Sequence, residues 1–319
     1  MIKALAITGP TASGKTALSL GVAETLGCEI ISCDSMQIYK NMNIGTAKAT
    51  EAEQKRVRHH LIDVISPSES FSANAYRSMA LHAAEDIYSR GKLPLFVGGT
   101  GLYLATLMRG ESPDVPESDP EYRRRIEEKL VGEEDRLALH ERLREVDPVS
   151  AEAIHYNNVR RVIRALEIYD ATGKPKSYFD ELSRRPSEKI KIKHITLDFH
   201  SRDTLYKRAD LRVHEMIREG LIDEVRSLLD EGLLDESLTA AQAIGYKEII
   251  PLIRGTISFD TAIERLKQAT RNYAKRQLTW FRHDLSAERV FRDSDDGSLR
   301  TSEELLSECI GIFKQFISE

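Results

Sequence analysis

Residues 4–16 read ALAITGPTASGKT, and this stretch is typical of a strand that runs into a glycine-rich turn. The apolar run at 4–8 predicts a buried strand, and the pattern over 15–26 predicts a helix. Between them, Gly9-Pro10-Thr11-Ala12-Ser13-Gly14-Lys15-Thr16 fits GxxxxGK[ST] in the strand–turn–helix context that the motif requires. Glycines let backbone N–H groups converge on an anion, and the helix N-terminus adds partial positive charge. We therefore predict a phosphate-binding loop in which Lys15 contacts phosphate oxygens and the Thr16 hydroxyl suits Mg²⁺.

The loop does not by itself say which phosphate compound it binds. Most such loops bind ATP or GTP, so nucleotide binding is an expectation. A hydrolase would also show a buried strand that ends in an acid and helps to hold Mg²⁺. The strand predicted at 94–97 is followed instead by Gly98 and Gly99, and the best candidate acid is Asp34, after the apolar run 29–32. A P-loop kinase or ATPase remains an open alternative.

Short apolar runs separated by helical stretches predict an α/β fold, a P-loop NTPase-like parallel sheet flanked by helices. The expected strands lie at 4–8, 29–32, 94–97 and 194–199, and the expected helices at 15–26, 77–90, 205–231 and 259–282.

Residues 111–120, ESPDVPESDP, are rich in proline and acid and indicate a boundary. From there to residue 189 the chain is strongly charged and helical in pattern. We expect a catalytic core formed by 1–110 and 190–319, and an all-helical insertion domain at 111–189.

The composition is that of an ordinary globular protein, with 319 residues, 41% hydrophobic and 30% charged, and a formal net charge of −5. This balance excludes a globally basic nucleic-acid coat but not local basic faces. Three cysteines without a CxxC pair, at 28, 33 and 309, argue against a disulfide framework or a cysteine zinc site and favour reduced, buried thiols. No apolar run approaches the ~18 residues of a membrane span. We expect a cytoplasmic protein with no membrane partner.

Six motifs follow one another along the chain, and together they identify a family. They are GPTASGKT at 9–16, DSMQIYKNMNIGTAK at 34–48, HHLID at 59–63, VGGTGLY at 97–103, AIGYKE at 243–248 and TRNYAKRQLTWFR at 270–282. With these motifs in this order, the chain resembles the bacterial tRNA dimethylallyltransferase (tRNA isopentenyltransferase, IPP transferase) family. The resemblance covers essentially its whole length.

The resemblance implies an activity, two partners and a cofactor. Such enzymes transfer a dimethylallyl group from dimethylallyl diphosphate to the N6 amine of the adenosine next to the 3′ side of the tRNA anticodon. The products are N6-dimethylallyladenosine and diphosphate. The phosphate loop then holds a prenyl diphosphate with Mg²⁺, which explains the missing hydrolytic acid. The expected partners are the anticodon stem-loop of tRNA and dimethylallyl diphosphate, and the protein is expected to be a monomer.

Three positions match catalytic residues of the family. Asp34 matches the general base, because an aromatic amine needs a carboxylate to take its proton. Arg212 matches an arginine at the diphosphate, and Thr100 matches a position at the reaction channel. Structural roles stay open for all three: a capping or Mg²⁺-linked carboxylate for Asp34, a solvated helix face shared with Arg208 for Arg212, and a helix N-cap for Thr100.

The target adenosine must leave the stacked anticodon loop, so the chain needs an RNA-binding surface beyond the pocket. An amide at Gln37 suits an adenine edge or, alternatively, organises its own loop. The family pattern IHPND stands here as IHYNN at 154–158, which weakens any role for Tyr156 and Asn158. Trp280 fits a core aromatic better than a base-stacking one, and His59 and His60 fit packing near the site better than zinc binding. The expected tRNA contacts are Asp34, Ser35, Met36, Gln37, Thr100, Arg123, Arg160, Arg161, Arg164, Arg271, Lys275, Arg276 and Arg282.

Two further functions remain open at this point. A prenyltransferase acting on free AMP or ADP would share the loop and Asp34 but would need no large RNA surface. A non-catalytic RNA-binding module would bind tRNA without needing Lys15, Thr16 or Asp34.

Overall fold

A computed structural model describes residues 1–110, 115–116, 118–183, 185–235, 238–284 and 286–319. The chain separates into two compact units, one formed by Met1–Met108 with Lys189–Glu319 and the other by Arg109–Glu188. These limits fall within two residues of the expected core and insertion. The boundary expected at 111–120 includes residues 111–114 and 117, which lie outside the described part of the chain.

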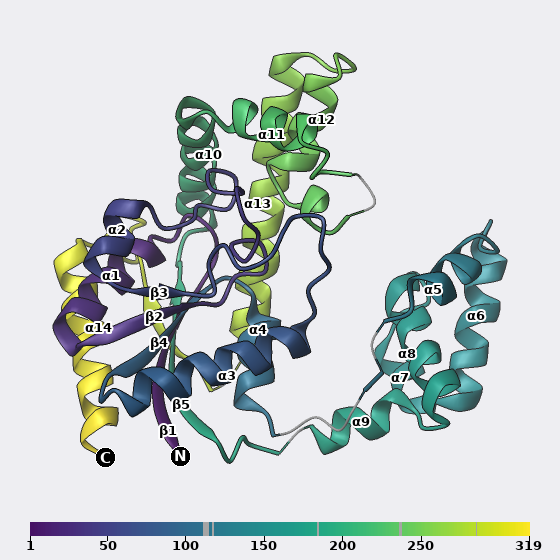
Figure 1. The fold of residues 1–319 in the computed structure, drawn as a ribbon, viewed down its shortest axis with the longest axis horizontal. Helices are drawn as coiled ribbons and strands as arrows, with labels where there is room; N and C mark the ends of the chain where they lie inside the picture. The colour runs from purple at the N-terminus through teal and green to yellow at the C-terminus, as the bar shows by residue number, and fades with distance from the viewer. Residues whose placement is uncertain (111–114, 117, 184, 236–237, 285) are drawn as a thin grey trace. The chain divides into compact units, whose positions relative to one another are not determined.

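The first unit is built on a parallel sheet whose described strands run in the order β3-β2-β4-β1-β5-β6 (Figure 1). The strands are β1 (Ile2–Thr8), β2 (Cys28–Ser32), β3 (His59–His60), β4 (Leu93–Gly98), β5 (Ile190–Asp198) and β6 (Glu288–Phe291). All four predicted strands are confirmed. β5 begins four residues earlier than expected, because Ile190 pairs with Ile2 of β1. The two short outer strands were not predicted, since runs of this length carry no periodic signal.

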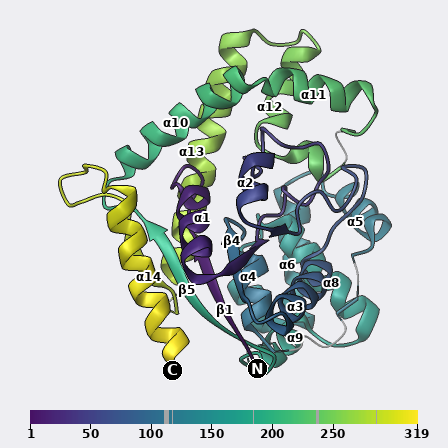
Figure 2. The same ribbon diagram turned by 60° about the vertical axis from the view of Figure 1, so that its left-hand side comes forward.

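Helices cover both faces of this sheet (Figures 1 and 2). On β1, Leu5 and Ile7 face α1 and α14, whereas Ala4 and Ala6 point to the face covered by α3 and α4. This alternation follows from the two-residue period of a strand, and burial on both faces explains why β1 is apolar throughout. The helices of this unit are α1 (Lys15–Leu26), α2 (Glu51–Arg56), α3 (Ala73–Ser89), α4 (Gly101–Met108), α10 (Arg202–Glu219), α11 (Leu221–Asp230), α12 (Tyr246–Ile253), α13 (Phe259–His283) and α14 (Ser302–Ser318), with a 3₁₀ turn at Ala240–Gln242.

The single helix predicted at 205–231 is wrong. Gly220 adopts a left-handed conformation with φ +102° and ends α10, and α11 starts at the next residue. A helical pattern on both sides of a lone glycine concealed the break, although glycine favours this conformation. The helix predicted at 259–282 is confirmed as α13.

The second unit is helical, as expected, and has a small core of its own. Leu143 of α6 and Val162 and Leu166 of α8 pack together in it. Its helices are α5 (Pro120–Glu127), α6 (Glu133–Val146), α7 (Pro148–Ala153), α8 (Val159–Thr172) and α9 (Lys176–Leu182). Within the described residues of both units, every helix is too short or too polar to cross a lipid bilayer.

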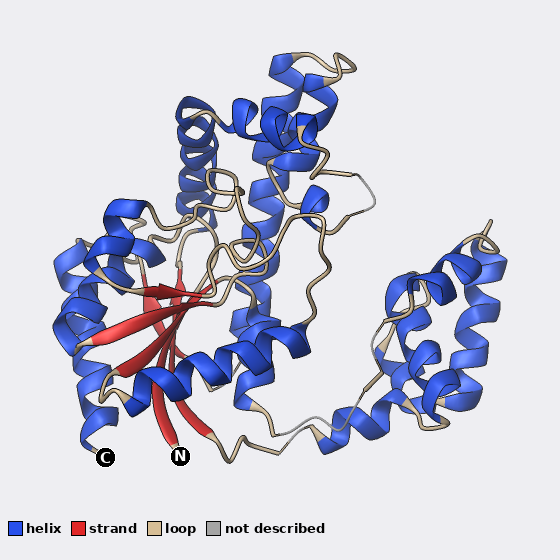
Figure 3. Cartoon of the chain, viewed as in Figure 1, coloured by secondary structure: helices blue, strands red, loops and turns tan. Residues whose placement is uncertain are grey.

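The sheet topology places the predicted site at one edge (Figure 3). Because the strands are parallel, their carboxyl ends meet at that edge, where ligands of such folds bind. The phosphate loop follows β1, Asp34 follows β2, and the glycine turn at Gly98–Gly99 stands at the carboxyl end of β4.

Candidate active site

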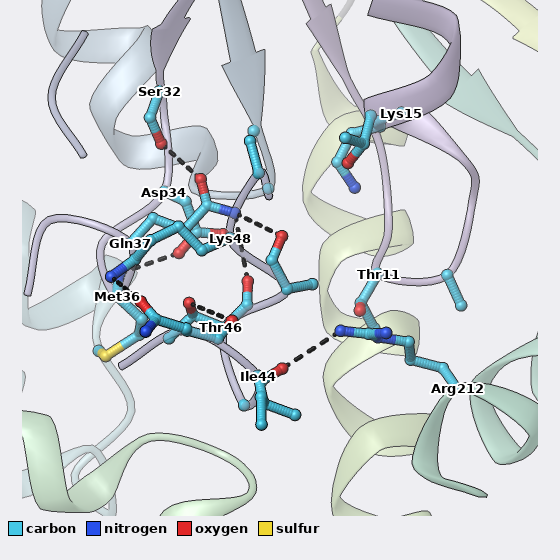
Figure 4. A pocket seen from close by; sticks show the side chains of 18 of the residues that line it. Thr11, Lys15, Ser32, Asp34, Met36, Gln37, Ile44, Thr46, Lys48 and Arg212 are labelled. Atoms are coloured by element: carbon cyan, nitrogen blue, oxygen red, sulfur yellow. Dashed lines mark hydrogen bonds between the residues drawn. The ribbon is translucent and has the colours of Figure 1, made fainter. Parts of the chain in front are cut away.

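A cavity of about 990 Å³ lies at this edge and is lined by residues of the first unit. Its walls come from the phosphate loop, the segments after β2 and β4, α10 and α13. Figure 4 shows Lys15 and Thr11 on one side of the cavity and Asp34, Met36 and Gln37 on the other. The sequence-predicted residues that it brings together are Thr11, Ala12, Gly14, Lys15, Thr16, Asp34, Ser35, Met36, Gln37, Arg212 and Arg276.

The phosphate loop has the backbone geometry that its glycines allow. Gly9 has φ +147° and packs against β5, so that a Cβ atom here would lie 2.9 Å from the Leu197 carbonyl oxygen. Gly14 has φ +88° and precedes α1. The Lys15 Nζ donates to the carbonyl oxygens of Gly9 at 3.0 Å and Pro10 at 2.7 Å. Burial lowers the pKa of Lys15 to about 8, and the charge of Asp34 opposes this shift.

Asp34 lies directly beyond the buried strand β2 and lines the cavity. Its Oδ1 accepts a hydrogen bond of 2.9 Å from the N–H of Met36, which fixes the turn. Burial raises the pKa of Asp34 above its ordinary value, and this hydrogen bond and the Lys15 charge hold the increase in check. A carboxylate with a raised pKa is a better proton acceptor than an exposed one.

Thr100, two residues after β4, supports this turn. Its Oγ1 accepts a hydrogen bond of 3.0 Å from the N–H of Ser35. The N–H of Thr100 donates to the Cys33 carbonyl oxygen at 3.1 Å. The structure therefore gives Thr100 a part in holding the segment that carries Asp34, and contact with substrate stays a prediction.

The Gln37 amide is engaged on both sides. Its Oε1 accepts from the Ser32 hydroxyl at 2.8 Å, and its Nε2 donates to the carbonyl oxygens of Thr46 and Ala47, each at 3.2 Å. This is the loop-organising role that the sequence left open, and Figure 4 shows these bonds as dashed lines. Recognition of an adenine edge by Gln37 stays a prediction.

Arg212 lines the cavity from α10 and contacts the loop that carries Ile44. Its Nη2 donates to the Ile44 carbonyl oxygen at 3.2 Å, and its Nη1 lies 3.6 Å from the Glu219 carboxylate. The loop that carries Ile44 is held from the other side by Glu224, which sequence analysis missed. The carboxylate of Glu224 accepts hydrogen bonds from the N–H groups of Asn43, Ile44 and Gly45 and from the Tyr246 hydroxyl.

Gln277 is a second residue that sequence analysis missed. It is buried on α13 and connects the phosphate loop with the glycine turn after β4. A signal was available, because Ala274, Gln277, Leu278 and Phe281 follow the spacing of a buried helix face. An amide on such a face needs hydrogen-bond partners, and here they belong to the site.

The basic residues predicted on α13 fall into two groups. Arg271 is paired with Asp210 at 2.8 Å, and Arg282 is paired with the buried Asp198 at 2.6 Å. Lys275 and Arg276 are exposed. The core role expected for Trp280 is wrong, since this side chain is 46% exposed where it packs on the turn at Gly101.

The basic residues predicted in the second unit also fall into an exposed group and a group paired with a buried acid. Arg160 and Arg161 are exposed in the first turn of α8. Arg164 lies 2.7 Å and Arg123 lies 3.5 Å from the carboxylate of the buried Glu167, which gives both arginines a structural role. Contact of any of these arginines with tRNA stays a prediction.

The three cysteines and His60 do not line the cavity, whereas His59 does. Cys28, Cys33 and Cys309 are buried, and burial raises the pKa of each thiol to about 12. The His60 Nε2 lies 2.8 Å from the Glu29 carboxylate. Over the described residues, no group of three histidine, cysteine or acidic side chains could hold a metal ion.

With this geometry established, comparisons with known proteins define the class. The family model described as IPP transferase matches residues 37–284. A tRNA dimethylallyltransferase of Geobacillus thermodenitrificans is 50% identical over 288 residues, which is 90% of this chain and 89% of the relative. One of Thermoanaerobacter sp. is 46% identical over 282 residues, which is 88% of this chain and 89% of the relative.

Solved structures that are similar to this chain indicate the same class of protein. The crystal structure of the tRNA delta(2)-isopentenylpyrophosphate transferase of Staphylococcus epidermidis is 38% identical, with a TM-score of 0.70 over 99% of both chains. A eukaryotic dimethylallyltransferase acting on tRNA is 30% identical, with a TM-score of 0.81 over 100% of this chain and 80% of the other. The chain belongs to the IPP transferase family, so the predicted resemblance, fold class and enzymatic nature are confirmed.

Proposed function

We propose that this protein transfers a dimethylallyl group from dimethylallyl diphosphate to the N6 amine of the adenosine next to the 3′ side of a tRNA anticodon. One observation carries the proposal: a single cavity holds a phosphate loop on one side and the Asp34 carboxylate on the other. An anion site facing a half-buried base is what an amine needs to displace a diphosphate.

The phosphate loop and Lys15 bind the diphosphate in this proposal. The backbone N–H groups at the start of α1 and the Lys15 ammonium lower the free energy of the charge that builds on the leaving oxygen. Lys15 is placed for this, since its Nζ already lies over the loop, 3.0 Å from the Gly9 oxygen.

Thr16 fits a magnesium ion that is bound mainly through substrate phosphates. Thr16 lines the cavity, and its hydroxyl makes no hydrogen bond to another described residue. Mg²⁺ dehydrates reluctantly and needs few protein ligands when phosphates supply the others. When bound there, the ion would neutralise charge on the diphosphate.

Asp34 takes the proton. As the amine nitrogen bonds to the first carbon of the dimethylallyl group, the bond from that carbon to the diphosphate oxygen breaks. The nitrogen then releases a proton to the Asp34 carboxylate, and the products are N6-dimethylallyladenosine and diphosphate. The raised pKa of Asp34 favours this transfer.

Each unit also offers positive charge to an RNA backbone. Lys275 and Arg276 are exposed on α13, and Arg276 lines the cavity. Arg160 and Arg161 lie in the first turn of α8, where no acid accompanies them. Positive charge at a helix N-terminus is unfavourable for folding, which supports a role in binding phosphates.

The test is an assay with purified protein, Mg²⁺ and radiolabelled dimethylallyl diphosphate. Unmodified tRNA with an adenosine-rich anticodon loop, AMP or no acceptor is supplied in parallel. We expect label in tRNA alone, and its loss in Asp34→Asn but not in Asp86→Asn, a change at an exposed acid of α3. Label in AMP would indicate a free-nucleotide prenyltransferase. Turnover of ATP without label in either acceptor would indicate a kinase or ATPase.

A further inference from the structure

Two arginines from distant parts of the sequence meet at the start of α1. Arg208 belongs to α10, and Arg292 follows β6 directly. A Cβ atom placed on Gly14 would lie 3.7 Å from the Arg208 Nη2 and 3.7 Å from the Arg292 Nε. Both guanidinium groups therefore reach the same end of the phosphate loop.

Neither arginine forms an ion pair with an acid among the residues that the structure describes, although the charge of Glu215 on the same helix acts on Arg208. The Arg208 Nε donates to the Ala12 carbonyl oxygen at 2.7 Å, and the Arg292 Nη1 donates to the Arg300 carbonyl oxygen. The acids nearby are engaged elsewhere: Asp198 with Arg282, Glu308 with Arg300, and Asp293 with the N–H groups of His200 and Ser201.

This arrangement carries an energetic cost in the absence of an anion. Both side chains are half-buried. Burial lowers the pKa of Arg292, and the charge of Arg208 lowers it further. Like charges that are partly removed from water favour the binding of a compensating anion, and guanidinium groups suit phosphate oxygens in shape.

The strand order says which part of the substrate would lie here. From β1, the strands β4 and β2 lead to Asp34 on one side, and β5 and β6 lead to Arg292 on the other. In a substrate held by the phosphate loop, the reacting carbon must face Asp34, where the amine attacks. Its terminal phosphate then points away from Asp34, toward the two arginines.

We propose that Arg292 and Arg208 form a subsite for the terminal phosphate of the prenyl diphosphate, at the end of the phosphate loop opposite to Asp34. The inference rests on the proposed function, since it assumes a prenyl diphosphate in the loop. It assigns a binding role to Arg292, which lies outside every motif that identified the family.

The experiment measures binding of inorganic pyrophosphate with Mg²⁺ by calorimetry, and inhibition of the transferase by dimethylallyl monophosphate. The variants of the full-length protein are Arg292→Gln, Arg292→Lys and, as a matched control, Arg289→Gln. Arg289 is exposed on β6 and donates to the Arg282 carbonyl oxygen, away from Gly14. Thermal melting verifies that each variant is folded.

We expect Arg292→Gln to raise the Kd of pyrophosphate about tenfold or more, the usual effect of losing a charge-assisted hydrogen bond. Arg292→Lys should recover part of this loss, and Arg289→Gln should match the wild type. Inhibition by the monophosphate, which lacks the terminal phosphate, should change little in Arg292→Gln.

Three results would overturn the subsite: an unchanged Kd of pyrophosphate in Arg292→Gln, equal weakening of monophosphate and pyrophosphate, or an increase only in the KM for tRNA. The last would place an RNA phosphate at Arg292. Failure of the proposed function looks different, because the wild type would then bind pyrophosphate but transfer no label to tRNA.

Discussion

Gln277 holds Thr11 of the phosphate loop through a hydrogen bond of 2.8 Å from the Thr11 N–H to its Oε1. The Nε2 of the same amide donates to the Gly99 carbonyl oxygen at 2.9 Å. The turn at Gly98–Gly99 packs on Cys33, where a Cβ atom on Gly98 would lie 2.0 Å from the Cys33 oxygen. One side chain of α13 therefore positions the anion-binding loop relative to the segment that carries Asp34.

Replacement of this amide should affect both stability and substrate binding. We expect Gln277→Ala to lower the free energy of unfolding by about 2 kcal/mol, because the Thr11 N–H and the Gly99 carbonyl lose their partner in a buried place. The KM for dimethylallyl diphosphate should rise as well. Denaturant unfolding and steady-state kinetics measure the two effects. Gln268→Ala, at an exposed position of α13, is the control and should change neither.

Asp34→Asn should reduce kcat by about 10²- to 10⁴-fold, the range of general-base catalysis. The base works without its proton, and burial raises its pKa, so activity should fall on acidification at a higher pH than for an ordinary aspartate. A profile of kcat/KM against pH measures this limb, which Asp34→Asn should lack. An acid limb that persists unchanged in the variant would contradict the assignment.

Lys15 should make pyrophosphate binding weaker in alkaline solution. Its pKa is lowered to about 8, so the free protein loses the ammonium charge as the pH rises through that value. A bound anion raises this pKa again, so binding above pH 8 should take up a proton. Calorimetry in buffers of different ionisation enthalpy detects the uptake. Lys15→Met should abolish it, whereas Lys207→Met, at an exposed position of α10, should not.

Glu224→Gln should loosen the loop that lines the cavity beside Arg212. A glutamine has one acceptor oxygen for the three N–H groups of residues 43–45 and the Tyr246 hydroxyl, which the two carboxylate oxygens now share. We expect a loss of about 2 kcal/mol in the free energy of unfolding and a higher KM for substrate. Asp223→Asn, at the exposed neighbouring position, serves as the control. Equal stability of the two variants would argue against this role.

The arginines of α8 should differ in role, with Arg160 and Arg161 binding tRNA and Arg164 stabilising the fold. The double change of Arg160 and Arg161 to alanine should weaken tRNA binding and reduce its salt slope by about two, with little change in stability. Arg164→Ala should instead lower the free energy of unfolding by about 2 kcal/mol, because it leaves the buried Glu167 poorly paired. Filter binding over a range of salt and thermal unfolding distinguish the two. A reversed pattern would contradict the division.

Much of the site could be predicted from local sequence. The phosphate loop and Asp34 follow strands whose apolar runs are visible in the chain, and parallel pairing brings such strand ends together. The role of each arginine, in RNA binding or in stabilising the fold, could not be predicted. A basic run in the sequence does not show which guanidinium group pairs with a buried acid. Arg282 finds Asp198 across 84 positions of sequence, whereas Lys275 on the same helix remains exposed.

By itself, the sequence determined the family, the α/β core with a helical insertion, and the loop that binds phosphate, since each depends on residues close together in the chain. Only the tertiary structure decided that Gln277 joins the two halves of the site, that Glu224 holds the 43–45 loop, and that Arg292 reaches Gly14. These contacts join segments more than a hundred residues apart, and only packing of helices on the sheet brings such segments within hydrogen-bond distance.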